Sequence, residues 1–94
     1  MSHEISDNAA ESRYEIRLDG RLAGFAEYRL RDDTVAFTHT EIDPEFGGRG
    51  LGSALARGAL DDVRSRSLRA VPHCSFIKGY IDRHPEYAEL VAAG

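Results

Sequence analysis

The stretch THTEIDPEFGGRGLGSAL, residues 38–55, runs from an alternating strand pattern through a glycine-rich turn into the start of a helix. Its glycines lack a Cβ, so the backbone can turn sharply and a ligand can approach it closely. A helix that opens directly after such a turn points its unpaired amides and the positive end of its dipole at the same place. The stretch therefore predicts a site for an anionic group, and phosphate is the usual occupant of such sites.

Two common nucleotide motifs fit this stretch poorly. A Walker loop ends in Gly-Lys-Ser/Thr, whereas Gly50-Leu51-Gly52-Ser53 contains no lysine. The dinucleotide fingerprint requires a third glycine three positions after the second, and the two alignments place Ser53 or Leu55 there. Both nucleotide interpretations are weakened.

Length, composition and charge limit the remaining choices. The 94 residues suffice for one domain with one core, and the hydrophobic fraction of 41% is ordinary for a globular protein. No apolar run approaches the roughly 18 residues of a membrane helix, and no signal peptide is recognisable, so we expect a cytoplasmic protein without membrane contact. The net charge of -4 argues against nucleic-acid binding. One cysteine, Cys74, and four scattered histidines predict neither a disulfide nor a metal site.

The start of the chain differs from the rest. Residues 1–12 are polar and show no periodicity, which predicts a flexible N-terminal tail before a single domain over residues 13–94. Within that domain, Asp19-Gly20 is a strong signal for a two-residue hairpin turn. Alternating patterns predict three antiparallel strands over residues 13–18, 21–30 and 35–42.

The second half of the chain alternates helix and strand. An apolar stripe predicts a helix over residues 50–67, a short strand follows over 68–74, and a second helix covers 75–83. The fold class is therefore α/β, a mixed sheet in the order β-β-β-α-β-α with the long helix on one face. Because Pro72 cannot donate to a ladder, we expect the last strand to separate from its parallel neighbour there. The glycine turn and Cys74 should then meet at the carboxyl ends of the two strands.

Four side chains are candidates for chemistry, each with a plain structural alternative. Cys74 at a strand-to-helix junction is either an activated nucleophile or a small buried apolar residue. His39 and Glu41 share one side of their strand, where they either accept a proton from an amine or form the wet face of the sheet. Tyr80 either protonates a leaving thiolate or packs in the core.

The glycine turn resembles motif A of the GCN5-related N-acetyltransferases, Q/R-x-x-G-x-G/A, which receives the coenzyme A pyrophosphate. Gly50-Leu51-Gly52 supplies the G-x-G part. Gly47 stands at the Q/R position, so the hydrogen bond of that side chain must come from Arg49 or be absent.

Further motifs make the resemblance more specific, and together they are similar to the small YjdJ-type branch of this family. The similarity covers about residues 14–91. The motifs are Thr38-His39-Thr40-Glu41, residues 44–52, residues 71–76, Tyr80-Ile81, His84-Pro85-Glu86-Tyr87 and Leu90-Val91.

The resemblance implies an N-acetyltransferase that uses acetyl-CoA or coenzyme A and acts on an amine, with protein lysines the usual suggestion. It implies that the pantetheine arm follows residues 40–42 and that the thioester ends near Cys74, which either accepts the acetyl group or lies beside a direct transfer. Glu41 or His39 would be the base and Tyr80 the acid. The implied coenzyme-binding residues are Thr40, Ile42, Gly47, Gly48, Arg49, Gly50, Leu51, Gly52 and Ser53.

One departure from the larger family bears on activity. Most of its members have two helices between the first two strands, and these helices build much of the acceptor site, whereas Asp19-Gly20 closes that interval here. The alternative is therefore a module that binds acyl-CoA or a protein partner without turnover. We expect a monomer or a weak dimer.

Overall fold

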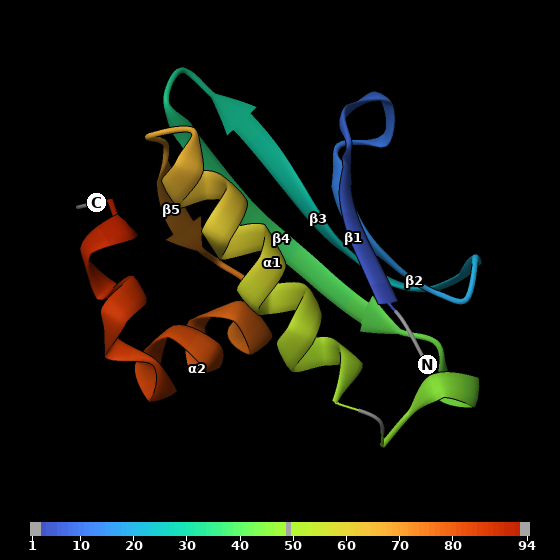
Figure 1. Cartoon of the computed structure of the whole chain (residues 1–94). Coiled ribbons are helices and arrows are strands. Elements are labelled where there is room, and N and C mark those ends of the chain that lie inside the picture. Colours follow the sequence, from blue (N-terminus) through green and yellow to red (C-terminus); the bar gives the residue numbers. More distant parts are fainter. Residues whose placement is uncertain (1–2, 49, 93–94) are drawn as a thin grey trace.

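The computed structural model describes residues 3–48 and 50–92, so Arg49 lies outside the described residues. The chain forms one five-stranded sheet in the spatial order β1-β2-β3-β4-β5, with α1 lying across one face (Figure 1). Neighbours from β1 to β4 are antiparallel, and β4 and β5 are parallel. The elements are β1 His3–Asn8, β2 Arg13–Leu18, β3 Arg21–Arg31, β4 Thr34–Ile42, α1 Leu51–Ser65, β5 Arg69–Pro72 and α2 Ser75–Arg83, with 3-10 helices at Ala9–Glu11, Pro44–Phe46 and Pro85–Leu90.

The predicted α/β class and mixed sheet are confirmed, and the prediction of a flexible tail is wrong for the described part of it. Strand β1 pairs with β2 along its whole length, from His3 opposite Leu18 to Asn8 opposite Arg13. The pattern was hidden because β1 is a polar edge strand whose one large apolar residue, Ile5, packs against the core. The order is therefore β-β-β-β-α-β-α, and the domain includes residues 3–8.

The hairpin predicted between β2 and β3 forms as expected. Asp19 and Gly20 both have positive φ, 50° and 84°, as a type I′ turn requires. On the next turn Asp32 also has a left-handed φ of 54°. The meander β2-β3-β4 thus follows from local turn chemistry.

The core lies between the sheet and the inner face of α1. Leu55, Ala59 and Val63 are fully buried at spacings of four, as the apolar stripe predicted. They face the buried sheet residues Ile16 and Phe37. The helix is thereby fixed across the sheet, with its N-terminus at the end of β4 (Figure 1).

A bulge in β4 decides which side chains point to the helix side. Glu27 pairs with His39 and Tyr28 pairs with Phe37, so Thr38 is an extra residue. Phe37 is buried on the helix side before the bulge; after it Thr40, opposite the buried Ala26, continues on that side. His39 therefore lies on the opposite face of the sheet.

Candidate functional site

The loop after β4 is tied down where it begins. The amide of Asp43 donates to the carbonyl oxygen of Ala23 at 2.8 Å, and its carboxylate accepts from the amide of Glu45 at 2.9 Å. The 3-10 turn Pro44–Phe46 follows, and the side chain of Phe46 is buried. These contacts fix the direction in which the backbone enters the glycine-rich loop.

The glycines of the loop differ in what their backbone does. The amide of Gly47 donates to the carbonyl oxygen of Pro44 at 3.1 Å, so it is not the free donor that the sequence predicted. Gly48 and Gly50 have φ of 78° and 72°, a left-handed conformation that glycine adopts more readily than any other residue. Backbone geometry thus favours glycine at these two positions.

Helix α1 begins with a cluster of unpaired amides. Gly50 is the N-cap and provides no side-chain cap, and the first intrahelical bond runs from the amide of Ala54 to the carbonyl of Gly50 at 3.1 Å. Within the described part of the chain, no acceptor bonds the amides of Leu51, Gly52 and Ser53. Three donors and the helix dipole therefore converge where an anion can bind.

Phe76 in the first turn of α2 forms one wall of this helix start. A Cβ built on Gly52 would lie 2.8 Å from Cζ of Phe76. Glycine at position 52 therefore reflects close packing of α2 on α1, in addition to any contact with a ligand.

Strands β4 and β5 separate where Pro72 predicted. Their ladder ends at Phe37 opposite Pro72, and the last bond between the two chain segments runs from the amide of Cys74 to the carbonyl of Phe37 at 2.9 Å. Beyond this point the β5 side of residues 38–42 has no strand partner in the described sheet. An unpaired strand edge therefore leads from Cys74 toward the glycine loop.

Cys74 lies at the end of this unpaired edge that is remote from the glycine loop. It is 8% exposed and is the N-cap of α2. Its thiol donates to the hydroxyl oxygen of Thr40 at 3.3 Å. Thr40 was predicted as a coenzyme contact, and its bond to the thiol is a role that only the tertiary structure reveals.

The two candidate bases lie elsewhere. Nε2 of His39 is 3.6 Å from Oε1 of Glu41, and both side chains are more than half exposed. By the pairing of β4 with β3 they point away from α1, and Glu41 borders a hollow of about 420 Å³ together with Leu22, Phe25 and Pro44. The structure thus brings His39 to Glu41 and places both on the face opposite Thr40, the partner of Cys74.

Tyr80 is packed between helices. It is 4% exposed, and its ring stacks on that of His84 with centroids 4.0 Å apart. Burial raises the pKa of its hydroxyl above the ordinary value of a tyrosine. It lines a hollow over α1 with Ser53 and Arg57, and no motif in the sequence pointed to Arg57.

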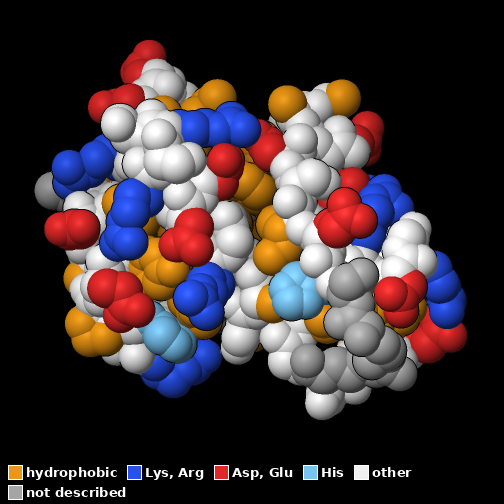
Figure 2. Space-filling model, in the orientation of Figure 1, with side chains coloured by type: hydrophobic (Ala, Val, Ile, Leu, Met, Phe, Trp, Pro, Cys, Tyr) orange, Lys and Arg blue, Asp and Glu red, His pale blue; other side chains and the backbone are white. Residues whose placement is uncertain are grey.

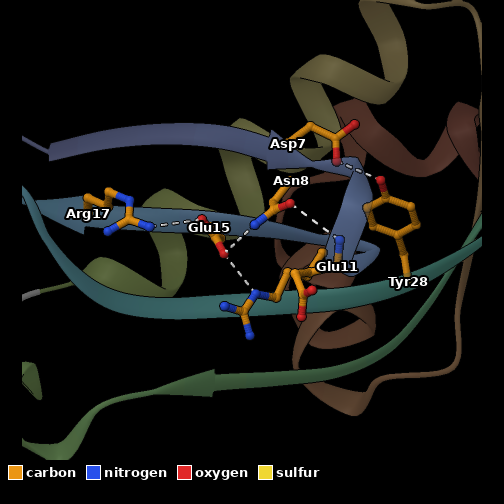
Figure 3. Close-up of polar contacts among 7 residues, drawn as sticks. Asp7, Asn8, Glu11, Glu15, Arg17 and Tyr28 are labelled. Atoms are coloured by element: carbon orange, nitrogen blue, oxygen red, sulfur yellow. Dashed lines mark hydrogen bonds and ion pairs between the residues drawn. The ribbon is translucent and has the colours of Figure 1, made fainter.

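A polar cluster on the far face of the sheet was also missed (Figure 3). Glu15 is 4% exposed and accepts from Arg13 at 2.8 Å, Asn8 at 3.0 Å and Arg17 at 3.3 Å. Burial alone would raise the pKa of Glu15, but the hydrogen bonds from Asn8 and Arg13 and the two guanidinium charges outweigh it and lower that pKa. The cluster fastens β1 to β2 and is structural.

Two further features bear on partners. Among residues 3–48 and 50–92, no three histidine, cysteine or acidic side chains are placed to hold a metal ion. No helix in the same residues has the length and apolar character to span a bilayer.

Unpaired amides at a helix start, beside the diverging ends of two parallel strands, define the class of α/β domains that bind phosphate-bearing ligands. A family model described as GCN5-related N-acetyl-transferase matches residues 13–90. The chain belongs to the GCN5-related N-acetyltransferase family, as its motifs predicted, and is by class an N-acetyltransferase.

Individual relatives agree with this assignment. Protein NATD1 of Xenopus tropicalis is 31% identical over 87 residues, which are 89% of this chain and 79% of the relative. The solution structure of a GCN5-like protein from Staphylococcus aureus aligns with a TM-score of 0.70 at 24% identity, over 97% of this chain and 89% of that one. The PaiA N-acetyltransferase of Thermoplasma acidophilum, solved with coenzyme A, aligns with a TM-score of 0.55 at 17% identity, over 79% and 48%. These two structures establish a shared fold.

Proposed function

We propose that the protein binds acetyl-CoA with the pyrophosphate on the helix-start amides and transfers the acetyl group to an amine. The observation that carries the proposal is the set of unpaired amides of Leu51, Gly52 and Ser53 behind the left-handed turn at Gly48 and Gly50. Family membership and the coenzyme A bound to the Thermoplasma acidophilum protein support the choice of ligand.

The unpaired edge of β4 gives the pantetheine arm a path. Its peptide groups at residues 38–42 face no strand on the β5 side, and such groups bond an extended chain readily. A pantetheine that follows Thr40 and Ile42 from the pyrophosphate ends beside Cys74. The thioester is therefore proposed to lie between the end of β4 and the start of α2.

Transfer has two chemical forms. In the direct form the amine loses a proton to Glu41 or His39, and the amine nitrogen attacks the thioester carbon. Because these two side chains lie on the opposite face of the sheet, the proton reaches them through water. The C–S bond breaks, and the coenzyme thiolate takes a proton from Tyr80 or from water. In the covalent form the thiol of Cys74 gives up its proton and its sulfur attacks the acetyl carbon, and the coenzyme leaves as the thiol. The amine then attacks this second thioester, the bond between the acetyl carbon and the sulfur of Cys74 breaks, and Cys74 regains a proton from the amine.

A titration with coenzyme A and acetyl-CoA tests the proposal. Gly50→Ala forces a side chain into the left-handed region, which costs roughly 1–2 kcal/mol and turns the amides of Leu51 and Gly52 away. We expect about a tenfold loss of affinity, or about 1.4 kcal/mol.

The matched control is Gly20→Ala. Gly20 also has a positive φ and open space for a Cβ, but it lies in the β2-β3 turn. We expect a similar loss of stability and unchanged affinity. Equal affinities in the wild type and Gly50→Ala, or no binding of either coenzyme by the wild type, would refute the proposed site.

The alternative is a module that holds acyl-CoA without transferring its acyl group. It is favoured by the burial of Cys74 and by the position of Glu41 on the other face of the sheet. Mass measurement after incubation with acetyl-CoA and an amine separates the two. Acetylated amine supports the enzyme, an acetyl group on Cys74 selects its covalent form, and bound coenzyme with neither product supports the module.

A further inference from the structure

The face of the sheet that points away from α1, here called the far face, is covered by neither α-helix. Helix α1 packs on the strands from one side, and α2 packs against α1 on that same side. Figure 2 looks onto this helix side and shows acidic and basic side chains mingled there. On the far face, by contrast, charges without a protein partner gather at two opposite ends of β3 and β4.

The first end of the far face is basic. Arg29 and Arg31 follow Glu27 at spacings of two on β3, so all three side chains project from the far face. Neither guanidinium has a hydrogen-bond or ion-pair partner among the described residues, whereas both far-face arginines of β2 are paired. The nearby carboxylate of Asp33 accepts from the hydroxyl of Thr34. Two guanidinium groups therefore have donors available for carboxylates of another molecule.

The other end of the far face combines acidic and apolar groups. Glu41 and Asp43 border the hollow of about 420 Å³, and Leu22, Phe25 and Pro44 are among its walls. In the described chain the one ionic partner of Glu41 is an imidazole 3.6 Å away, which is not a permanent cation, and Asp43 has no cation within ion-pair distance. Such a hollow fits an arginine, with its aliphatic stem on the apolar walls and its guanidinium at the carboxylates.

A two-fold axis brings the two ends together. Phe25 and Arg29 are four residues apart on β3, or about 13 Å, and Glu27 lies midway between them, opposite His39 of β4. Rotation about an axis that crosses the strands at this level reverses their direction. The basic end of each copy then lies over the acidic hollow of the other, so that the same contact forms twice.

We propose that two copies of this chain associate through their far faces, with Arg29 and Arg31 of each copy in the hollow beside Glu41 and Asp43 of the other. The molecule measures 36 × 29 × 20 Å, and the two layers of the fold account for the shortest dimension. The far face thus extends over on the order of 1,000 Å², which is sufficient for the roughly 800 Å² per partner of a specific interface.

The far-face dimer goes beyond the proposed function and does not depend on it, because the coenzyme is proposed to lie at the start of α1. Since the far face is largely polar, much of the buried area contributes little to affinity. We therefore expect a weak dimer with a dissociation constant of roughly 10–100 µM.

Sedimentation equilibrium of the full chain at about 1 µM to about 1 mM and low ionic strength tests the proposal. Arg29→Glu and Glu41→Arg each place like charges opposite one another at both contacts, so each variant alone should dimerise at least about tenfold more weakly than the wild type. An equimolar mixture of the two variants should restore the wild-type constant, because both contacts of the mixed dimer again join opposite charges. Arg83→Glu reverses an unpaired charge on α2 and should dimerise like the wild type.

Dilution of the wild type, followed by NMR, locates the interface without any substitution. Amide shifts should change with concentration in residues 22–31 and 36–43 and stay constant in α2. If a charge reversal prevents folding, this experiment decides alone.

Three results would overturn the proposal. A wild type that stays monomeric up to about 1 mM leaves the far face to solvent or to a different partner. A dimer that withstands both charge reversals, or a mixture of the two variants that stays monomeric, excludes the contact between Arg29 and Glu41. Shifts confined to the helix side place the interface elsewhere.

Discussion

At the scale of single residues, the structure separates groups that the sequence placed together. Cys74 was predicted beside the thioester and Glu41 or His39 as the base, yet only Cys74 lies at the separated strands, where it contacts Thr40. The bulge at Thr38 accounts for the difference, because a one-residue insertion in β4 reassigns its side chains between the faces. A direct mechanism must therefore relay a proton around β4, whereas the covalent one begins at Cys74.

Glu15 gives a prediction about pH at this scale. Its folded-state pKa is lowered, so its stabilising contribution is fully present above the ordinary value of 4.5 and is lost as the pH falls through the lowered pKa. Glu15→Gln should reduce the free energy of unfolding at pH 7 by about 1–3 kcal/mol, since the guanidinium groups of Arg13 and Arg17 lose their charged partner.

Urea unfolding at several pH values checks this. The stability difference between wild type and Glu15→Gln should be constant above about pH 5 and shrink below pH 4.5. Glu27→Gln, at an exposed position of β3 with no ion pair among the described residues, should change stability little at any pH. A difference that grows on acidification would contradict the structural role of Glu15.

At the scale of elements, contacts between the side chains of β1 and residues of α1 and β3 stabilise β1 in the sheet. Ile5 packs on α1 at Gly58, where an added Cβ would lie 2.5 Å from Cδ1 of Ile5. The hydroxyl of Tyr28 donates to the carboxylate of Asp7 at 2.6 Å (Figure 3). A strand with little apolar character thus becomes part of the sheet through its partners.

Gly58→Ala makes this packing measurable. Replacing glycine within a helix gains about 1 kcal/mol, but overpacking against Ile5 costs roughly 1–3 kcal/mol, so we expect a net loss of about 1 kcal/mol. In an Ile5→Ala background the clash is gone, and the same change should stabilise the protein by about 1 kcal/mol. Thermal unfolding of the four proteins in this cycle gives the coupling, and additive effects would show that β1 does not dock on α1.

At the scale of the whole molecule, the proposed coenzyme site lies between elements that few contacts join. It draws on the loop after β4, the first turns of α1 and α2, and the unpaired edge of β4. A ligand that bridges these parts and binds only the folded state must raise its stability by mass action.

Saturation with coenzyme A should therefore increase the melting temperature strongly. At a coenzyme concentration 100 times its dissociation constant the gain is about 2.7 kcal/mol, and at roughly 4–8 °C per kcal/mol for a domain of this size the shift should exceed about 10 °C. Sodium chloride at the same ionic strength, added in place of the coenzyme, serves as the control. A shift below about 2 °C at that saturation would mean that the ligand does not bind the folded site.

The sequence by itself determined the local elements and the family. Period-2 patterns, the Asp19-Gly20 turn and the apolar stripe of α1 are encoded within a few residues of one another, so β2, β3, β4 and α1 were predictable. The place where β4 separates from β5 was predicted as well, but not its cause: the amide of Arg69 donates to Asp33 and the carbonyl of Ala70 accepts from Ala92, so by alternation Pro72 faces away from β4.

Only the tertiary structure decided the edge strand, the faces and the hollow over α1. Strand β1 takes its stability from the adjacent strand β2 and from Gly58, which lies far along the chain from it. The face of Glu41 depends on a bulge that only pairing with β3 creates. Arg57 and His84 are 27 positions apart and meet because α2 folds back on α1. Contacts of this kind depend on packing between distant segments, and no local pattern of side chains encodes them.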